Sequence, residues 1–132
     1  MLRPRALNHV ALTVADMDKT LHFYQALGLE LLRTSGPAAD GVRSAVLRVS
    51  GAQEINVFHR AGLGAIDQED RTGMHHFCMD MDAPSIDGLK EALRQAGVSV
   101  SRGPIERRDG TSVFVSDPDG VRVELRVARR EA

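Results

Sequence analysis

The chain repeats its opening pattern halfway along its length, and this repeat constrains the fold more than any other feature of the sequence. Residues 8–14 (NHVALTV) and 75–81 (HHFCMDM) are short strand-like runs that begin near a histidine and lead into an amphipathic stretch. His9 and His76 lie 67 residues apart in a chain of 132 residues. We therefore expect two copies of one structural unit.

Each half is expected to contain one helix and four strands. Asp16 and Ser85 precede apolar residues at helical spacing, and Gly28 and Gly97 follow them. This pattern is typical of helices that begin at an N-cap and end at a glycine. Alternating apolar residues predict strands at 7–14, 29–34, 42–49, 53–59, 76–81, 98–102, 111–116 and 121–127, with a loop at 103–110 and a tight turn at 117–120 (DPDG).

This order of elements predicts an α+β fold of two βαβββ modules, eight strands in all, with one helix covering each sheet. We expect a single domain over residues 1–132, with modules at about 7–59 and 74–127 and a linker at 60–73.

The composition limits the classes of function. Seventeen basic and eighteen acidic side chains give a formal charge of −1, so the positive patch of a nucleic-acid or anionic-membrane binder is not expected. No apolar run reaches the roughly 20 residues that a membrane span requires. The single cysteine, Cys78, cannot form an internal disulfide, which favours a reducing compartment, the cytoplasm.

Side-chain alternation predicts that the faces turned away from the helices carry polar residues. These are His9 on the first strand, His76, Cys78 and Asp80 on the fifth, and Arg122, Glu124 and Arg126 on the last. If the two sheets curl toward each other, the two histidines and the glutamate line one pocket. Imidazole and carboxylate groups are common metal ligands, so this pocket is a candidate metal site.

The sequence resembles the vicinal oxygen chelate superfamily, which includes glyoxalases, bleomycin and fosfomycin resistance proteins and extradiol dioxygenases. The similarity rests on residues 9–12 (HVAL), 23–24 (FY), 28–29 (GL) and 117–120 (DPDG) followed by Glu124, and it extends over about 7–127. The resemblance implies two βαβββ modules that form a cup around one divalent metal ion, within one chain or across a homodimer.

Carried over by position, the resemblance implies that His9, His76 and Glu124 bind the metal. A fourth position carries glutamate in glyoxalase-like members; here Asn56 matches the local context, and Glu54 lies two residues earlier. We favour Asn56 at this position and keep Glu54 as the alternative. Two histidines and one carboxylate suit Fe(II), with Mn also favoured and Zn or Ni as alternatives.

Three further residues on the predicted pocket face are candidates for substrate binding, namely Cys78, Arg122 and Arg126. Arg107 and Arg108 are expected to be solvated charges at the rim of the pocket, and His75 is expected not to bind metal.

These features favour a metal-dependent enzyme that acts on a small oxygenated substrate, with Glu124 as the catalytic carboxylate. Because Asn56 cannot act as a base, ring cleavage of the extradiol-dioxygenase type is favoured over a glyoxalase-like lyase (lactoylglutathione lyase type). A non-catalytic small-molecule binding or resistance protein is the third hypothesis. We expect a small-molecule ligand and a homodimer, and neither a nucleic-acid nor a membrane partner.

Overall fold

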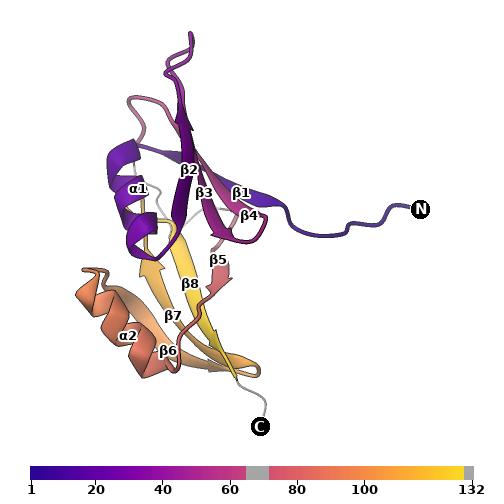
Figure 1. Ribbon diagram of the computed structural model, residues 1–132, viewed down its shortest axis with the longest axis vertical. Coiled ribbons are helices and arrows are strands. Elements are labelled where there is room, and N and C mark those ends of the chain that lie inside the picture. The colour runs from indigo at the N-terminus through magenta and orange to yellow at the C-terminus, as the bar shows by residue number, and fades with distance from the viewer. Residues whose placement is uncertain (65–71, 130–132) are drawn as a thin grey trace. The chain divides into compact units, whose positions relative to one another are not determined.

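Both halves of the chain fold in the order that the repeat predicts (Figure 1). The computed structural model describes residues 1–64 and 72–129, and the chain divides into two compact units, Met1–Gly64 and Ala65–Ala132. The predicted linker at 60–73 includes residues 65–71, which lie outside the described residues.

The first unit is a βαβββ module. Its elements are β1 (His9–Val14), α1 (Met17–Ala26), β2 (Glu30–Ser35), β3 (Arg43–Ser50) and β4 (Gln53–His59). The sheet order is β1-β4-β3-β2; β1 pairs with β4 in parallel, and the other neighbours are antiparallel. The helix lies on one face of this sheet and contacts β2 and β4.

The second unit has the same topology. Its elements are β5 (Phe77–Asp80), α2 (Ile86–Gln95), β6 (Val100–Arg107), β7 (Gly110–Ser116) and β8 (Arg122–Ala128). The sheet order is β5-β8-β7-β6, with β5 parallel to β8 and the other neighbours antiparallel. This arrangement repeats the first sheet strand for strand, and it confirms the predicted pair of βαβββ modules.

The two helices begin and end where their local sequences direct. The Asp16 carboxylate accepts a hydrogen bond from the Lys19 backbone N–H, and the Ser85 hydroxyl accepts one from the Gly88 N–H, each at 3.0 Å. These are N-caps that satisfy otherwise unpaired donors of the first helical turn. Gly28 and Gly97 follow the two helices with φ of 102° and 75°, which glycine adopts without steric cost.

Apolar residues of the strands and helices form the core. The side chains that are fully or almost fully buried include Tyr24, Leu47 and Val57 in the first unit, and Leu89, Val113 and Leu125 in the second. On the strands these residues alternate with polar ones, so each sheet has one apolar face and one polar face.

The prediction for β6 was wrong at its C-terminal end. The Gly103-Pro104 pair predicted a loop over 103–110, but the strand continues to Arg107 through an irregular register between Arg102 and Ile105. Proline is tolerated because β6 is an edge strand of its sheet. A side chain at Gly103 would also meet the Ser112 carbonyl oxygen at 2.9 Å, so the close approach of β7 requires glycine there.

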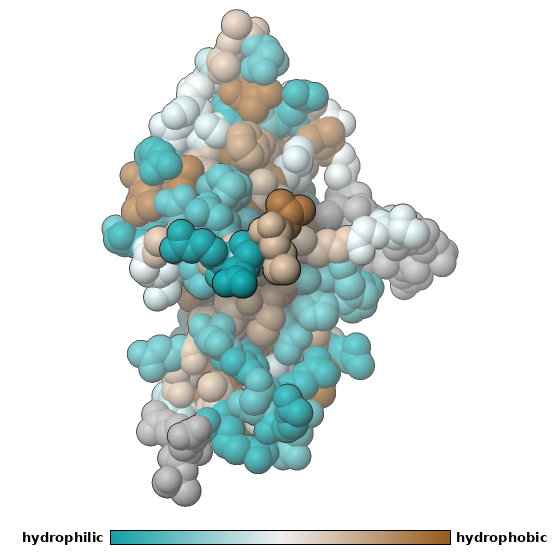
Figure 2. Space-filling model, turned by 90° about the vertical axis from the view of Figure 1, so that its right-hand side faces the viewer, coloured by the Kyte–Doolittle hydropathy of each residue, from teal (hydrophilic) through white to brown (hydrophobic). Residues whose placement is uncertain are grey.

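On the face shown in Figure 2, the hydrophobic residues are scattered over the surface and are not clustered. Large hydrophobic side chains that are exposed among the described residues are Met1, Leu2, Leu7, Phe58, Leu63 and Met74. Among the described helices, none has the length and apolar character needed to cross a membrane.

Candidate functional site

A row of cross-strand neighbours organises the polar face of the second sheet. Cys78 on β5 pairs with Glu124 on β8, Glu124 with Phe114 on β7, and Phe114 with Arg102 on β6. Directly opposed residues share one face of a sheet. We call the face that carries these four residues the polar face.

The Asp-Pro-Asp-Gly turn sets the position of Glu124. The Asp117 carboxylate accepts hydrogen bonds from the backbone N–H groups of Asp119 and Val121, both at 2.9 Å. Gly120 completes the turn at a φ of 87°. The turn therefore fixes where β8 begins, and Glu124 follows four residues after its glycine.

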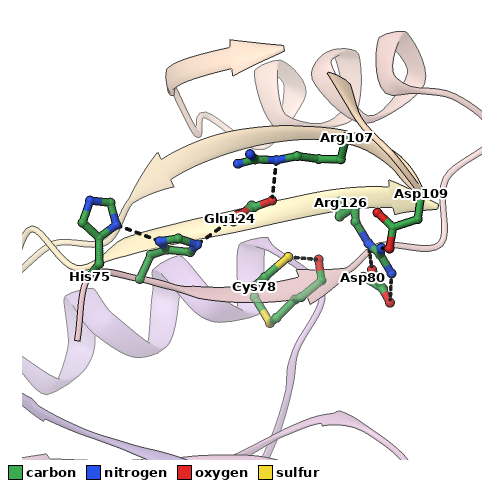
Figure 3. Close-up of polar contacts among 9 residues, drawn as sticks. His75, Cys78, Asp80, Arg107, Asp109, Glu124 and Arg126 are labelled. Atoms are coloured by element: carbon green, nitrogen blue, oxygen red, sulfur yellow. Dashed lines mark hydrogen bonds and ion pairs between the residues drawn. The ribbon is translucent and has the colours of Figure 1, made fainter. Parts of the chain in front are cut away.

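His76 and Glu124 form the centre of the polar face. His76 Nε2 lies 3.0 Å from Glu124 Oε1 (Figure 3). The sequence predicted that His76 begins the fifth strand, but it is the residue before β5. Glu124 is only 7% exposed. The His76 ring also meets the Phe114 ring edge to face, with centroids 5.1 Å apart. Two of the three predicted metal ligands are thus brought together.

Arg107 is a member of this group that the sequence analysis missed. Its Nε atom lies 3.6 Å from Glu124 Oε2, and the side chain reaches from β6 toward β8 (Figure 3). The sequence predicts only a solvated rim charge at Arg107, which lies within the predicted loop at 103–110. The register irregularity between Arg102 and Ile105 puts both Arg102 and Arg107 on the polar face, which strict alternation over five residues does not predict.

His75 contacts the second nitrogen of His76. The Nδ1 atoms of the two rings lie 2.8 Å apart, so one of them donates a hydrogen bond and the other accepts it. The pKa of His75 is lowered, first by loss of hydration and then by the charges of Arg122 and His76. A neutral His75 can therefore act as either partner in this bond.

Cys78, a predicted substrate-binding residue, lies on the polar face as a thiol. Partial burial raises its pKa to about 11, and the carboxylates of Glu124 and Asp80 add to this effect. Its Sγ–H donates a weak hydrogen bond to the Met79 carbonyl oxygen at 3.9 Å. At neutral pH the group is a small neutral side chain rather than a nucleophilic thiolate.

Arg126, another predicted substrate-binding residue, is held by two carboxylates. Its guanidinium donates hydrogen bonds to both carboxylate oxygens of Asp80 on β5, and the distance from Nη2 to Oδ2 is 2.9 Å (Figure 3). It also donates a hydrogen bond to Asp109 in the β6–β7 turn. These contacts raise the pKa of Arg126 and lower that of Asp109. Arg122 lies two residues before Glu124 with the same strand parity.

The polar face of the first sheet carries the remaining predicted ligands. His9 pairs with Glu54 across β1 and β4, and Ala11 pairs with Asn56. Because the Asn8 Oδ1 atom can only accept, the 2.8 Å contact makes His9 Nδ1 the donor. The Asn56 Oδ1 atom is buried and has no hydrogen-bond partner within the described residues.

The imidazole, carboxylate and amide groups of His76, Glu124, His9 and Asn56 are chemically suited to bind a divalent metal. Within residues 1–64 and 72–129, no three metal-binding side chains cluster. However, two ligands that bind one ion at about 2.1 Å and at right angles are about 3.0 Å apart, which is the separation of His76 Nε2 and Glu124 Oε1. The His9 imidazole, and the Asn56 oxygen that has no hydrogen-bond partner among the described residues, are further groups able to bind a metal.

The comparisons with known proteins place the chain in a family. A model described as Glyoxalase/Bleomycin resistance protein/Dioxygenase superfamily matches residues 6–125. The chain therefore belongs to this superfamily, as the resemblance to vicinal oxygen chelate proteins predicted.

Several known proteins are similar over nearly the whole chain. A lactoylglutathione lyase from Haemophilus influenzae is 34% identical over 123 residues, which cover 89% of this chain and 88% of that protein. Virulence protein STM3117 from Salmonella typhimurium is 33% identical over 125 residues, or 90% and 81% of the two chains. The crystal structure of a glyoxalase/dioxygenase from Nostoc punctiforme matches with a TM-score of 0.78 at 26% identity, covering 98% and 97%.

Proposed function

We propose that the protein is a metal-dependent enzyme that acts on a small substrate with two adjacent oxygen atoms. The observation that carries this proposal is the contact between His76 and the buried carboxylate of Glu124. We assign His76, Glu124 and His9 as metal ligands, with Asn56 as a neutral fourth donor. A divalent metal bound there supplies Lewis-acid stabilisation of negative charge on the substrate oxygens.

The reaction we favour is proton transfer between adjacent carbons, as in a glyoxalase-like lyase. The sequence favours ring cleavage because Asn56 cannot act as a base. We assign that role to Glu124, whose Oε2 atom lies 3.6 Å from Arg107 Nε while Oε1 faces His76. A positioned carboxylate can remove a proton from one carbon and return it to the next. The similarity to lactoylglutathione lyases supports this assignment.

Ring cleavage of a catechol remains the second candidate. It is favoured by the donor set of two histidines and one carboxylate, which suits Fe(II) with open positions for substrate and dioxygen. Asn56, an amide where glyoxalase-like members carry glutamate, is consistent with this smaller set.

Metal analysis of protein purified without added ions tests the proposed class. We expect about one Fe, Mn, Zn or Ni ion per chain, and we expect its loss in His9→Ala, His76→Ala and Glu124→Gln. His22→Ala, which removes an exposed histidine of α1, should retain the metal. A metal content that is unchanged in Glu124→Gln contradicts the proposal.

Two assays then separate the reactions. A glyoxalase-like lyase consumes the hemithioacetal of methylglyoxal and glutathione, and Glu124→Gln should lower that rate by at least about 100-fold, within the 10²–10⁴ range of acid–base catalysis. A ring-cleaving dioxygenase instead consumes oxygen with catechols when loaded with Fe(II). Activity in neither assay, in protein that binds metal, removes both assignments.

The fourth donor is tested by exchanging charge at the two candidate positions. If Asn56 binds the metal, Asn56→Asp should tighten divalent metal binding and Glu54→Gln should leave it unchanged. The opposite pattern assigns Glu54, the direct cross-strand neighbour of His9.

The homodimer and the cytoplasmic location stay predictions. Analytical ultracentrifugation of the purified chain tests the first, since a monomer at micromolar concentration contradicts it. Fractionation of cells that produce the protein tests the second.

A further inference from the structure

The polar face of the second sheet carries more positive than negative charge. Four arginines lie on it, and three carboxylates reach it. The arginines are Arg102, Arg107, Arg122 and Arg126, and the carboxylates are Asp80, Asp109 and Glu124. Asp80 and Asp109 both pair with Arg126, and Glu124 contacts Arg107 and His76.

Arg102 differs from Arg107 and Arg126 in its partner. Within the part of the chain that the structure describes, its guanidinium contacts the ring of Phe114, with Cζ 6.0 Å from the ring centroid, and forms no ion pair. The side chain is exposed. A guanidinium held over an aromatic ring is oriented by that ring and keeps its N–H groups available.

Phe114 connects Arg102 to the candidate metal ligands. One ring meets both the Arg102 guanidinium and the His76 imidazole, whose centroid is 5.1 Å away. Arg102 and Glu124 are separated by two strand spacings, which amounts to about 10 Å between their backbones. A molecule the size of a substituted benzene ring spans this separation.

From these contacts we propose that Arg102, on its Phe114 platform, binds a carboxylate of the substrate. The ligand group is one carboxylate of the substrate, separate from its two reacting oxygens. One unpaired guanidinium balances one negative charge, and its planar fork matches a planar carboxylate in a bidentate contact. The inference rests on the proposed function for the position of the reacting oxygens, but the anion site itself needs no metal.

The test uses metal-free protein and two probes of matched shape, benzoate and the uncharged benzamide. Affinities are measured by NMR titration, with the Arg102 Nε–Hε signal identified by its absence in Arg102→Lys. We expect benzoate to shift this signal and to bind at least about fivefold more tightly than benzamide. Arg102→Gln should remove the preference, and Phe114→Leu should reduce it because the guanidinium loses its platform.

Arg108→Gln is the matched control, since it removes the same charge from an exposed position in the β6–β7 turn. It should retain the preference for benzoate. Arg102→Lys should retain only part of it, because an ammonium group cannot form the forked contact. Equal affinity for the two probes, or a preference that survives Arg102→Gln in folded protein, overturns the inference.

Because this titration is done without metal, its result is independent of the metal assay. A benzoate preference in a protein that fails to bind metal leaves the anion site in place and removes the proposed function. Metal binding without a preference for benzoate removes the anion site and leaves the proposed function in place.

Discussion

Glu124 places a carboxyl group at a position that is only 7% exposed, so its oxygens need partners inside the protein. A carboxylate oxygen can only accept, and His76 Nε2 at 3.0 Å is therefore a donor to Oε1 when no metal is bound. His76 Nδ1 then accepts from His75. A metal on His76 Nε2 would leave the ring proton on Nδ1, which would then donate to His75. His75 can thus support both tautomers of His76.

His75→Ala should weaken metal binding by about 10- to 100-fold, the usual effect of removing a group that orients a metal-binding histidine. The affinity for Zn(II) is measured by competition with a chromophoric chelator, and the fold is checked by circular dichroism. His22→Ala serves as the control for loss of an exposed histidine. An affinity equal to that of the wild type shows that water replaces His75 without loss.

The sequence could predict the residue types of the candidate site but not all of its members. Strand alternation placed Glu124 on the polar face, and the repeat paired His76 with His9. Arg107 was missed because the sequence does not show the register irregularity in β6, and the His75 contact was missed because alternation says nothing about how far a side chain reaches. The structure places Glu54, not Asn56, directly beside His9. Pairing register is set by whole strands, so no single residue pattern predicts it.

At the scale of elements, the side chain of a single N-cap residue stabilises the start of each helix. Ser85→Ala removes the acceptor for the Gly88 N–H and should lower the free energy of unfolding by about 1 kcal/mol, within a range of roughly 0.5–2 kcal/mol. Lys90→Ala, at an exposed position of α2, should change it by less than about 0.5 kcal/mol. Urea unfolding at pH 7 measures both, and equal midpoints contradict the capping role.

Arg126 joins β5, β8 and the β6–β7 turn, and this network should make stability depend on pH. The hydrogen bond from Arg126 lowers the pKa of Asp109 below its ordinary value of about 3.9. A carboxylate with a lowered pKa in the folded state stabilises the protein above the ordinary pKa, and this contribution is lost as the pH falls through the folded value.

Asp109→Asn should therefore lower the urea midpoint at pH 7, and its difference from the wild type should shrink below about pH 4. Glu106→Gln, at an exposed position of the same hairpin, is the control and should behave like the wild type. A difference for Asp109→Asn that is constant from pH 7 to pH 3 contradicts a role for the ion pair.

The predicted boundaries of the elements are correct where a single capping residue or glycine determines them. Asp16 and Ser85 start the helices, and Gly28 and Gly97 end them, as the spacing predicted. The end of β6 did not follow, because Gly103-Pro104 normally interrupts a strand. Only the position of β6 at the sheet edge, which depends on the order of all four strands, makes the pair acceptable there.

At the scale of the whole molecule, the repeat was the most informative feature of the sequence. Two halves with the same order of elements form two sheets with the same strand order and the same parallel pair. The repeat predicts this because the physical constraints on one half apply equally to the other. It does not predict the reaction, because the chemistry depends on positions where the halves differ, such as Asn56 and Glu124.

Metal binding should stabilise the whole chain if both units supply ligands. A metal at 100 times its dissociation constant adds about 2.7 kcal/mol to the free energy of unfolding. For a chain of this length, each kcal/mol raises Tm by about 3–5 °C, so we expect a rise of roughly 10 °C. Differential scanning calorimetry with and without Mn(II) or Zn(II) measures it.

Single substitutions in each unit show which unit contributes to this rise in Tm. His9→Ala in the first unit and Glu124→Gln in the second should each remove most of the rise in Tm, whereas His22→Ala should retain it. If His9→Ala keeps the full rise while Glu124→Gln loses it, the metal is bound by the second unit alone. His9 would then be a structural histidine, and the ligand set implied by the repeat would have to be replaced by one drawn from the polar face of the second sheet.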